Sequence, residues 1–329
     1  MRPLVGTALI VTATVVAACS GAGGGGGNEF PAGTGGAGAA GAGGTVVGGT
    51  GGVGGLLADA APGGNGGGSS DGCSDESRFV YVIDSDNTLY RFDPQVQAPS
   101  AFQPIAPMGC HAGEGPNSMA IGRDGFAYVL YGTQDPYSIN GYDCAGVFKV
   151  DIKTAACAGP STFQCGSAGF EKFGMGFSTD SAGGTTDALY LSNSLSPQLG
   201  RVDLVSGQVT ALGSLPGAAE FTGNAKGELW GFFPDQSPPK VLQIDKTNGH
   251  TITSFSLGAL PDLGFGGYAY AFAFWGGSFY IFYDVEDVDT STNVWKLDVD
   301  GSVTKYIANT GLRIVGAGVS TCAPVEPPK

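Results

Sequence analysis

Few side chains in this sequence could carry out catalysis. The chain has two histidines, so a Ser-His-Asp triad would have to use His111 or His250. His250 follows Asn248 and Gly249, which are typical turn residues, and we expect a solvated histidine there. His111 lies near Glu114 and is the better candidate for acid-base chemistry. Because the chain after residue 72 also lacks a G-x-S-x-G motif, we predict no catalytic residue.

An acidic run, DVEDVD, could bind a metal ion. Its carboxylates belong to Asp284, Glu286, Asp287 and Asp289, and oxygen ligands of this kind suit calcium. The run lacks the glycine and the terminal glutamate of a helix-loop-helix calcium site, and most charge runs are simply solvated. A zinc site has less support, because no paired C-x-x-C spacing is present. We therefore expect no cofactor, with calcium as the open alternative.

The seven cysteines indicate an oxidising compartment. Their number is odd, but Cys19 directly follows an N-terminal apolar run and has a separate role, described below. The remaining six can pair completely in the periplasm or outside the cell. The cysteines therefore predict three disulfides in a secreted domain.

The elements that must position all these residues repeat along the chain. The segment from Phe173 to Leu215 reads as four short strands joined by turns. Its third strand, LGRVD, has the counterparts LYRFD, VFKVD, VLQID and VWKLD, spaced about 40 to 60 residues apart. Each copy ends in an aspartate that we expect to cap a turn through Asx-type hydrogen bonds. These are Asp93, Asp151, Asp203, Asp245 and Asp298.

Five such units predict an all-β chain folded as a β-propeller of five four-stranded blades. The first unit, which begins at Phe79, has no small and apolar strand before it. Residues 314–321, IVGAGVST, have that character at the other end of the chain. We therefore expect this C-terminal strand to complete the first blade and close the ring, which removes exposed sheet edges. Glycine and alanine are expected in the inner strands because these strands pack closely near the axis.

The strand alignment also predicts the disulfide pairing. Cys73 precedes the second strand of the closing blade and Cys322 follows its first strand, so a bond between them would lock the ring where it closes. By proximity, Cys157 should pair with Cys165 across an outer hairpin of the second blade. Cys110 would then join Cys144 in that blade's long insertion.

Function in a propeller gathers on one face, where the loops that lead into the first strands meet the loops between the second and third strands. A binding surface is therefore expected from the polar and aromatic residues that precede or begin the inner strands. These candidates are Asn117, Glu171, Lys172, Glu220, Tyr268 and Arg313.

The N-terminal residues 1–18 contain one arginine followed by an apolar run, as in a secretory signal peptide. The sequence VAAC, which ends at Cys19, resembles the bacterial lipobox. This resemblance implies cleavage before Cys19 and lipidation of that cysteine. Ser20 resembles the default for sorting to the outer membrane. We thus predict an outer-membrane lipoprotein that faces the periplasm or the cell surface.

Residues 19–72 form the predicted tether between this anchor and the propeller. They are almost wholly glycine, alanine, serine and threonine, without lysine or arginine. Such a segment cannot bury enough apolar surface to offset its ordering entropy, so we expect it to be disordered. The predicted propeller domain then covers residues 73–323, and residues 324–329 form a short tail.

The net charge of −14 disfavours nucleic acid and anionic lipid headgroups as partners. An envelope glycan, a peptide or a protein remains as the expected ligand, in addition to the membrane that the lipid anchor would contact. We expect the closed ring to be a monomer.

The repeat resembles the YVTN/NHL-like class of bacterial β-propellers. The lipobox and the long Gly/Ala tether resemble lipoproteins of bacteria with complex envelopes, such as the myxobacteria. The resemblance implies several possible activities, because such propellers serve as lactonases, lyases, quinone-dependent dehydrogenases, lectins and envelope scaffolds. The inner strands here offer Gly, Ala, Phe and Met rather than converging metal ligands or a tryptophan floor. A binding or scaffold module is therefore the favoured prediction, and a lactonase-like or quinone-dependent enzyme is the alternative.

Overall fold

The computed structural model describes residues 72–96, 98–110, 113–134, 141–263, 268–286 and 288–328. The predicted signal peptide, Cys19 and the tether up to residue 71 lie outside the described residues. The same holds for His111 and for Asp287 of the acidic run.

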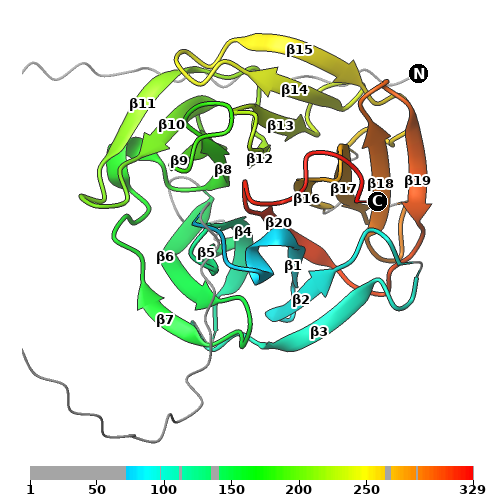
Figure 1. Ribbon diagram of the computed structural model, residues 1–329, viewed down its shortest axis with the longest axis horizontal. Coiled ribbons are helices and arrows are strands. Elements are labelled where there is room, and N and C mark those ends of the chain that lie inside the picture. The colour runs from blue at the N-terminus through cyan, green and yellow to red at the C-terminus, as the bar shows by residue number, and fades with distance from the viewer. Residues whose placement is uncertain are drawn as a thin grey trace, which may run out of the picture. The chain divides into compact units, whose positions relative to one another are not determined.

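Five four-stranded antiparallel sheets surround a central axis, as Figure 1 shows. Blade 1 consists of β20 (Ile314–Val319), β1 (Val80–Asp84), β2 (Thr88–Phe92) and β3 (Phe102–Pro107). Blade 2 consists of β4 (Gly115–Ile121), β5 (Phe126–Gln134), β6 (Tyr142–Asp151) and β7 (Cys157–Pro160). Blade 3 consists of β8 (Phe173–Thr179), β9 (Asp187–Asn193), β10 (Gln198–Val202) and β11 (Val209–Ser214).

Blade 4 consists of β12 (Glu220–Gly223), β13 (Leu229–Phe233), β14 (Lys240–Ile244) and β15 (Thr251–Ser256). Blade 5 consists of β16 (Tyr268–Trp275), β17 (Ser278–Val285), β18 (Asn293–Asp298) and β19 (Val303–Ile307). Two short 3-10 turns, η1 (Glu76–Arg78) and η2 (Ser167–Gly169), complete the described elements. The prediction of an all-β, five-bladed propeller is confirmed.

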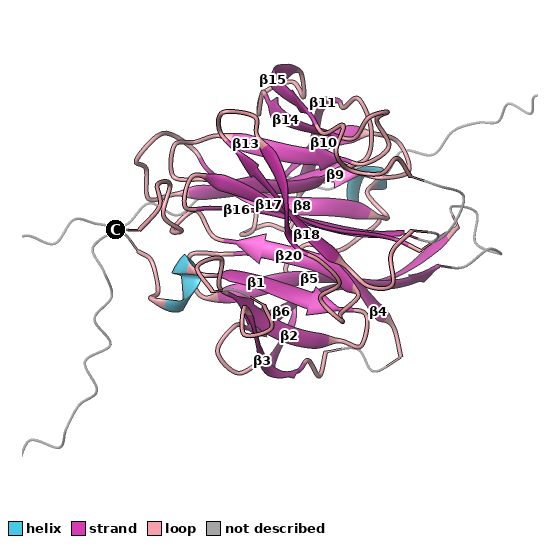
Figure 2. Cartoon of the chain, turned by 90° about the vertical axis from the view of Figure 1, so that its right-hand side faces the viewer, coloured by secondary structure: helices cyan, strands magenta, loops and turns pink. Residues whose placement is uncertain are grey.

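The C-terminal strand closes the ring as the sequence predicts. β20 pairs antiparallel with β1, with Val82 opposite Ala317 and Val80 opposite Val319. β20 also packs against the inner strands of the two neighbouring blades, β16 of blade 5 and β4 of blade 2. Figure 2 shows β20 between β1 and the β16–β17 pair. The two ends of the propeller domain therefore meet in one blade.

Small residues let the inner strands pack directly against each other. A side chain at Gly174 of β8 would collide with the carbonyl of Ala219, just before β12. At Gly223 of β12 it would collide with the carbonyl of Phe177 in β8. The expected reason for glycine in these strands is thus confirmed. Larger aromatic side chains fill the space between blades further out, as where Trp230 packs against Phe279 with ring centroids 4.9 Å apart.

The aspartates after the third strands act mainly as turn caps. The carboxylates of Asp93, Asp151, Asp203 and Asp245 each accept a hydrogen bond from the backbone N–H two residues later, at 2.8 to 2.9 Å. The backbone bond from Val205 lowers the pKa of Asp203, and the hydroxyl of Thr247 together with its backbone N–H lowers the pKa of Asp245. The fifth aspartate, Asp298, differs, because its carboxylate accepts from Ser278 at 2.6 Å and pairs with Lys296 at 2.8 Å.

The described residues contain three disulfides, and the strand alignment predicts one of them correctly. Cys73 and Cys322 are bonded at the ring closure, with their Cα atoms 5.9 Å apart. The other two predicted pairings are wrong. Cys110 pairs with Cys157, and Cys144 pairs with Cys165.

The length of β6 explains the correction. Cys144 lies near the start of this ten-residue strand rather than in a loop. Cys157 lies opposite Val150, six residues further along β6. At roughly 3.3 Å per residue this places Cys144 and Cys157 at opposite ends of the blade, about 20 Å apart. Each therefore bonds to the cysteine at its own end.

Candidate functional site

A cavity of about 530 Å³ opens at one end of the propeller axis. The N-terminal ends of the inner strands surround it, together with the ends of β5 and β9. Every blade contributes at least one lining residue. The lining consists of Asn117, Gln134, Lys172, Ser194, Leu195, Ala218, Glu220, Tyr268, Ala269, Tyr270, Arg313 and Val315. We call this cavity the axial cavity.

The structure brings together five of the six residues predicted for a binding face. Asn117, Lys172, Glu220, Tyr268 and Arg313 all line the axial cavity. Glu171 is absent from the lining and lies beside the turn at Gly166.

Several lining residues lie outside the binding face that the sequence predicts. Tyr270 follows Tyr268 by two positions in β16, and residues at this spacing share one face of a strand. The alternation in the sequence could therefore have identified Tyr270. Gln134 belongs to the cavity because β5 is nine residues long, and no pattern in the sequence indicates that length.

Glu220 is a buried acid at the wall of the axial cavity. Glu220 is 5% exposed, and its Oε2 accepts a hydrogen bond from the Ser118 hydroxyl at 2.8 Å. Burial raises the pKa of the carboxyl well above its ordinary value. Hydrogen bonds from Ser118 and the Met175 backbone, and the charge of Lys172, lower the pKa by less than burial raises it. The net effect of the surroundings of Glu220 therefore favours the neutral acid over the carboxylate.

Lys172 places a desolvated amine in the same cavity. Its Nζ lies 5.3 Å from the centre of the Tyr142 ring. In the amide orientation that satisfies both ends of Gln134, the Gln134 oxygen accepts from Nζ at 2.7 Å while its nitrogen donates to the Gly141 carbonyl. Burial lowers the pKa of the ammonium, and the nearby Glu220 opposes this shift.

Aromatic and aliphatic side chains form part of the cavity's rim. The rings of Tyr268 and Tyr270 stack with their centroids 5.9 Å apart and their planes 20° from parallel. Tyr268 is 48% exposed, and Leu195 in blade 3 is 41% exposed. The exposed side chains of Tyr268 and Leu195 thus offer apolar surface in the lining of a cavity that also contains polar and charged groups.

Arg313 lies between the axial cavity and a second cavity of about 300 Å³, because it lines both. Its Nη1 pairs with Glu286 at 3.0 Å and approaches the Asp284 carboxylate at 3.5 Å. Two residues of the predicted calcium run thus form ion pairs with this arginine.

A third residue of the run, Asp289, is engaged by protein groups as well. Its carboxylate accepts hydrogen bonds from the Val285 backbone and from the Asn293 amide, at 3.2 and 2.6 Å. Within the described ranges, no group of three or more His, Cys, Asp or Glu side chains is arranged to hold a metal ion. Asp287 lies outside those ranges, so calcium binding stays a prediction.

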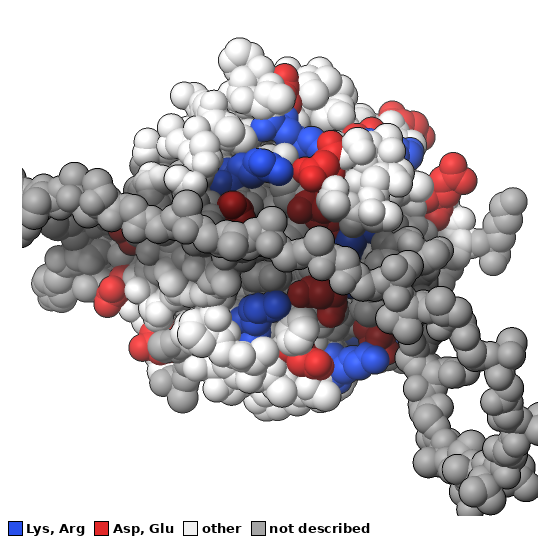
Figure 3. All heavy atoms as spheres, turned by 60° about the vertical axis from the view of Figure 1, so that its left-hand side comes forward, with Lys and Arg blue, Asp and Glu red and all other residues white. Residues whose placement is uncertain are grey.

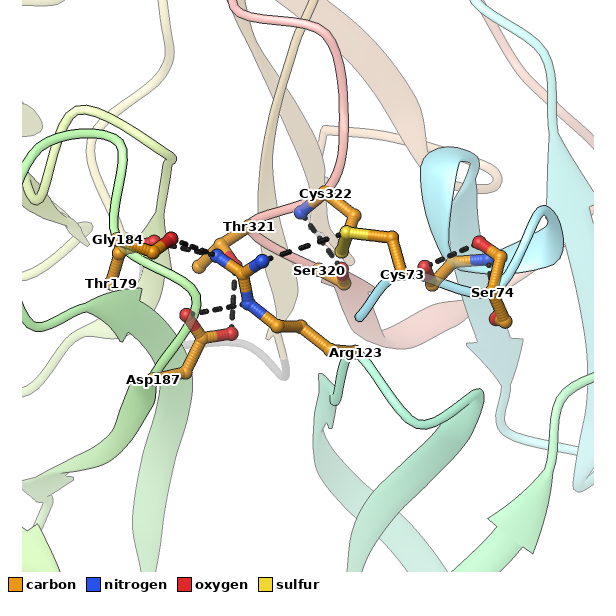
Figure 4. The surroundings of a disulfide bond; sticks show 10 residues. Cys73, Ser74, Arg123, Thr179, Gly184, Asp187, Ser320, Thr321 and Cys322 are labelled. Atoms are coloured by element: carbon orange, nitrogen blue, oxygen red, sulfur yellow. Dashed lines mark hydrogen bonds and ion pairs between the residues drawn. A yellow bond between two sulfur atoms is a disulfide. The ribbon is translucent and has the colours of Figure 1, made fainter. Parts of the chain in front are cut away.

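At the opposite end of the axis, a polar network lies around the Cys73–Cys322 disulfide (Figure 4). Arg123, in the turn after β4, pairs through Nε with Asp187 at 3.0 Å and donates to Thr179 and the Gly184 carbonyl at 3.2 and 3.1 Å. Thr321 donates to the other oxygen of Asp187 at 2.7 Å. The network connects blades 1, 2 and 3, whereas the axial cavity lies at the other ends of the inner strands.

The outer surface shows no concentration of one charge on the face in Figure 3, where lysine and arginine alternate with aspartate and glutamate over the described part of the surface. Exposed pairs such as Arg201 with Asp180, at 3.4 Å, are typical of such a surface. In the part of the chain that the structure describes, no helix is long and apolar enough to cross a membrane.

Comparison with known proteins assigns no family to this chain. No model of a known protein family matches the chain, and no curated protein matches its sequence. A protein of unknown function from Bacteroides caccae superposes with a TM-score of 0.43 at 11% identity, covering 73% of this chain and 97% of that one. A chain of a nidogen/laminin complex gives 0.45 at 9% identity, with the same coverage. TolB from Acinetobacter baumannii gives 0.39 at 13% identity, covering 70% of this chain and 52% of that one.

The buried acid leads to a prediction about stability. Replacing Glu220 with glutamine should raise the free energy of unfolding near neutral pH, because burial disfavours the ionised carboxylate and the neutral amide avoids this cost. A carboxyl whose pKa is higher in the folded state destabilises the fold as pH rises above its unfolded value of 4.5. Variant and wild type should therefore have similar stability near pH 4 and diverge above it.

Urea denaturation between pH 4 and 8 measures this difference. The matched control is Glu171→Gln, because Glu171 neighbours the cavity without lining it. A Glu220→Gln variant that is less stable than wild type at every pH would show that the carboxylate is an ionised, structurally required group.

Proposed function

We propose that the protein is a binding module of the bacterial cell envelope that holds its ligand in the axial cavity. The observation that carries the proposal is the convergence of polar and aromatic side chains from all five blades on one cavity. Its volume of about 530 Å³ is in the range of sites that enclose small molecules or the end of a chain, roughly 300 to 1,000 Å³. The site is built on the ends of rigid strands, which favours preorganised recognition.

The three disulfides indicate an oxidising, extracytoplasmic location. We propose in addition that lipidated Cys19 anchors the chain to the outer membrane and that residues 20–72 let the propeller stand clear of it. The resemblance of VAAC to a lipobox supports this anchor. Mass spectrometry of the N-terminal peptide from the native host tests it, and an uncleaved peptide that begins at Met1 would contradict it.

An extracytoplasmic glycan is the ligand class that the cavity favours. Tyrosine rings stack well on the apolar faces of sugars, and amide or hydroxyl groups such as those of Asn117, Gln134 and Ser194 can both donate and accept hydrogen bonds to sugar hydroxyls. A single sugar or a chain end is small enough for the cavity.

Binding of the mature chain to a glycan array and to solubilised envelope fractions tests the proposal. We expect Tyr268→Ala and Leu195→Ala to weaken binding of the selected ligand by about ten-fold or more, since rim side chains that bury apolar area contribute roughly 1 to 3 kcal/mol. Ile252→Ala is the matched control, because Ile252 is exposed on the outer strand β15. If all three variants bind as wild type does, the axial cavity is not the binding site.

The same samples distinguish binding from catalysis. The ligand is recovered after incubation and its NMR spectrum is compared with that of the untreated ligand. An unchanged ligand supports the binding module. Conversion of the ligand, lost in Glu220→Gln, would instead establish the enzyme alternative.

A further inference from the structure

We propose that the ligand of the axial cavity is an acidic saccharide, a sugar that carries a carboxylate, and that Lys172 binds this carboxylate. The inference rests on the proposed function, because it specifies the ligand of the same cavity. The observation behind it is that the two cations in the lining, Arg313 and Lys172, have different contacts.

The two cations that line the cavity have different surroundings. The guanidinium of Arg313 is held by two carboxylates, those of Glu286 and Asp284. The ammonium of Lys172 contacts the Gln134 amide oxygen at 2.7 Å and faces the Tyr142 ring, and both of these groups are neutral. Arg313 is therefore already compensated, whereas no carboxylate among the described residues forms an ion pair with Lys172, and a ligand can compensate its charge.

Glu220 offsets the desolvation of Lys172 only in part, and no ion pair joins these two side chains among the described residues. The acid is buried among inner-strand residues and engages the hydroxyl of Ser118, and its burial favours the uncharged form. A desolvated ammonium without an ionised partner is unfavourable, so an incoming carboxylate gains a charge-assisted hydrogen bond and removes this cost. The cavity thus selects a negative charge although the whole chain carries −14.

The other lining groups favour a sugar over a small organic acid. A simple carboxylate would leave the stacked Tyr268 and Tyr270 rings and the Asn117 and Ser194 side chains without contacts. A sugar acid presents an apolar face for the rings, hydroxyls for the polar side chains and a carboxylate for Lys172. The chemistry of the cavity is then matched group by group.

Isothermal titration of the full mature chain tests the inference with two probes, tri-galacturonate and its methyl ester, which share the sugar backbone and differ in whether the carboxyl groups are charged. We expect wild type to bind the acid at least ten-fold more tightly than the ester, as charge-assisted hydrogen bonds in desolvated sites do. Lys172→Gln should lower the affinity for the acid to that for the ester and leave the ester unaffected. Lys172→Arg, which keeps the charge, should retain the preference.

Lys226→Gln is the matched control, because it removes an equal charge from an exposed lysine in the turn after β12, at the opposite end of that strand. It should bind both probes as wild type does. Circular dichroism verifies that each variant is folded. If Lys172→Gln fails to fold, wild type and Lys172→Arg still test the inference, because both should bind the acid more tightly than the ester.

The failures are distinguishable. Equal binding of acid and ester, weakened by Tyr268→Ala, would overturn the acidic ligand and leave the proposed function intact. If no saccharide binds but a peptide binds through its terminal carboxylate in a Lys172-dependent way, the ligand is not a saccharide. No binding of any probe, acidic or neutral, would overturn the proposed function together with the inference.

Discussion

Loss of the Cys73–Cys322 disulfide is expected to lower the free energy of unfolding by up to about 5 kcal/mol, because the bond closes a loop of 249 residues. The constraint acts mainly on the unfolded chain, whose ends it keeps together. In the folded protein the bond joins the segment before β1 to the segment after β20. These two strands are neighbours in blade 1 and come from opposite ends of the propeller domain. A double variant, Cys73→Ser with Cys322→Ser, should unfold at a clearly lower guanidinium concentration.

The two disulfides of blade 2 are the internal controls. The loops that they close have sequence separations of 47 and 21, for which the same entropy argument gives about 4 and about 3 kcal/mol. Removing Cys144–Cys165 should therefore cost less than removing Cys73–Cys322. The reverse order would show that the ring closure is held by strand pairing alone. Peptide mapping without reduction confirms which bonds each variant retains.

Replacing Arg123 with methionine is expected to destabilise the protein by about 3 to 5 kcal/mol, the usual cost of leaving one partner of a buried ion pair uncompensated. The side chains of Arg123 and Asp187 are 13% and 7% exposed, and the pair joins blade 2 to blade 3. The loss also removes the bonds of Arg123 to Thr179 and Gly184. Thermal unfolding with and without denaturant measures the change.

Two further variants separate the buried charge from the lost contacts. Arg123→Met combined with Asp187→Leu should recover a large part of the stability, because the uncompensated carboxylate is gone. Arg201→Met removes an exposed pair with Asp180 and should cost less than about 1 kcal/mol. If Arg123→Met is as mild as Arg201→Met, the network at this end of the axis contributes little to the ring.

These two features assign different roles to the two ends of the propeller. The disulfide and the Arg123 network stabilise the C-terminal ends of the inner strands, where three blades are joined. The axial cavity lies at the N-terminal ends, where Glu220 and Lys172 are desolvated and in part uncompensated. Stability is thus supplied at one end, and the polar groups that reduce it are gathered at the other, as is common for binding sites.

The sequence determined the architecture, because each blade repeats a local pattern. The third strands ending in aspartates such as Asp203 and Asp245 predict the blade number, and short-range Asx bonds explain why the pattern recurs. The small residues of 314–321 predict the closing strand, since the inner strands pack backbone against backbone. The positions of Lys172 and Glu220 at the starts of inner strands follow from the same alignment.

Tertiary structure alone decided the properties that depend on distances between blades or along long strands. The pairing of Cys144 with Cys165 depends on the length of β6, which no turn residue indicates. Arg313, which lines the cavity in blade 1, forms an ion pair with Glu286 of the acidic run in blade 5, and the sequence does not indicate this contact. Desolvation is a property of everything packed around a group. The raised pKa of Glu220 and the lowered pKa of Lys172 therefore arise only when the blades around them are assembled.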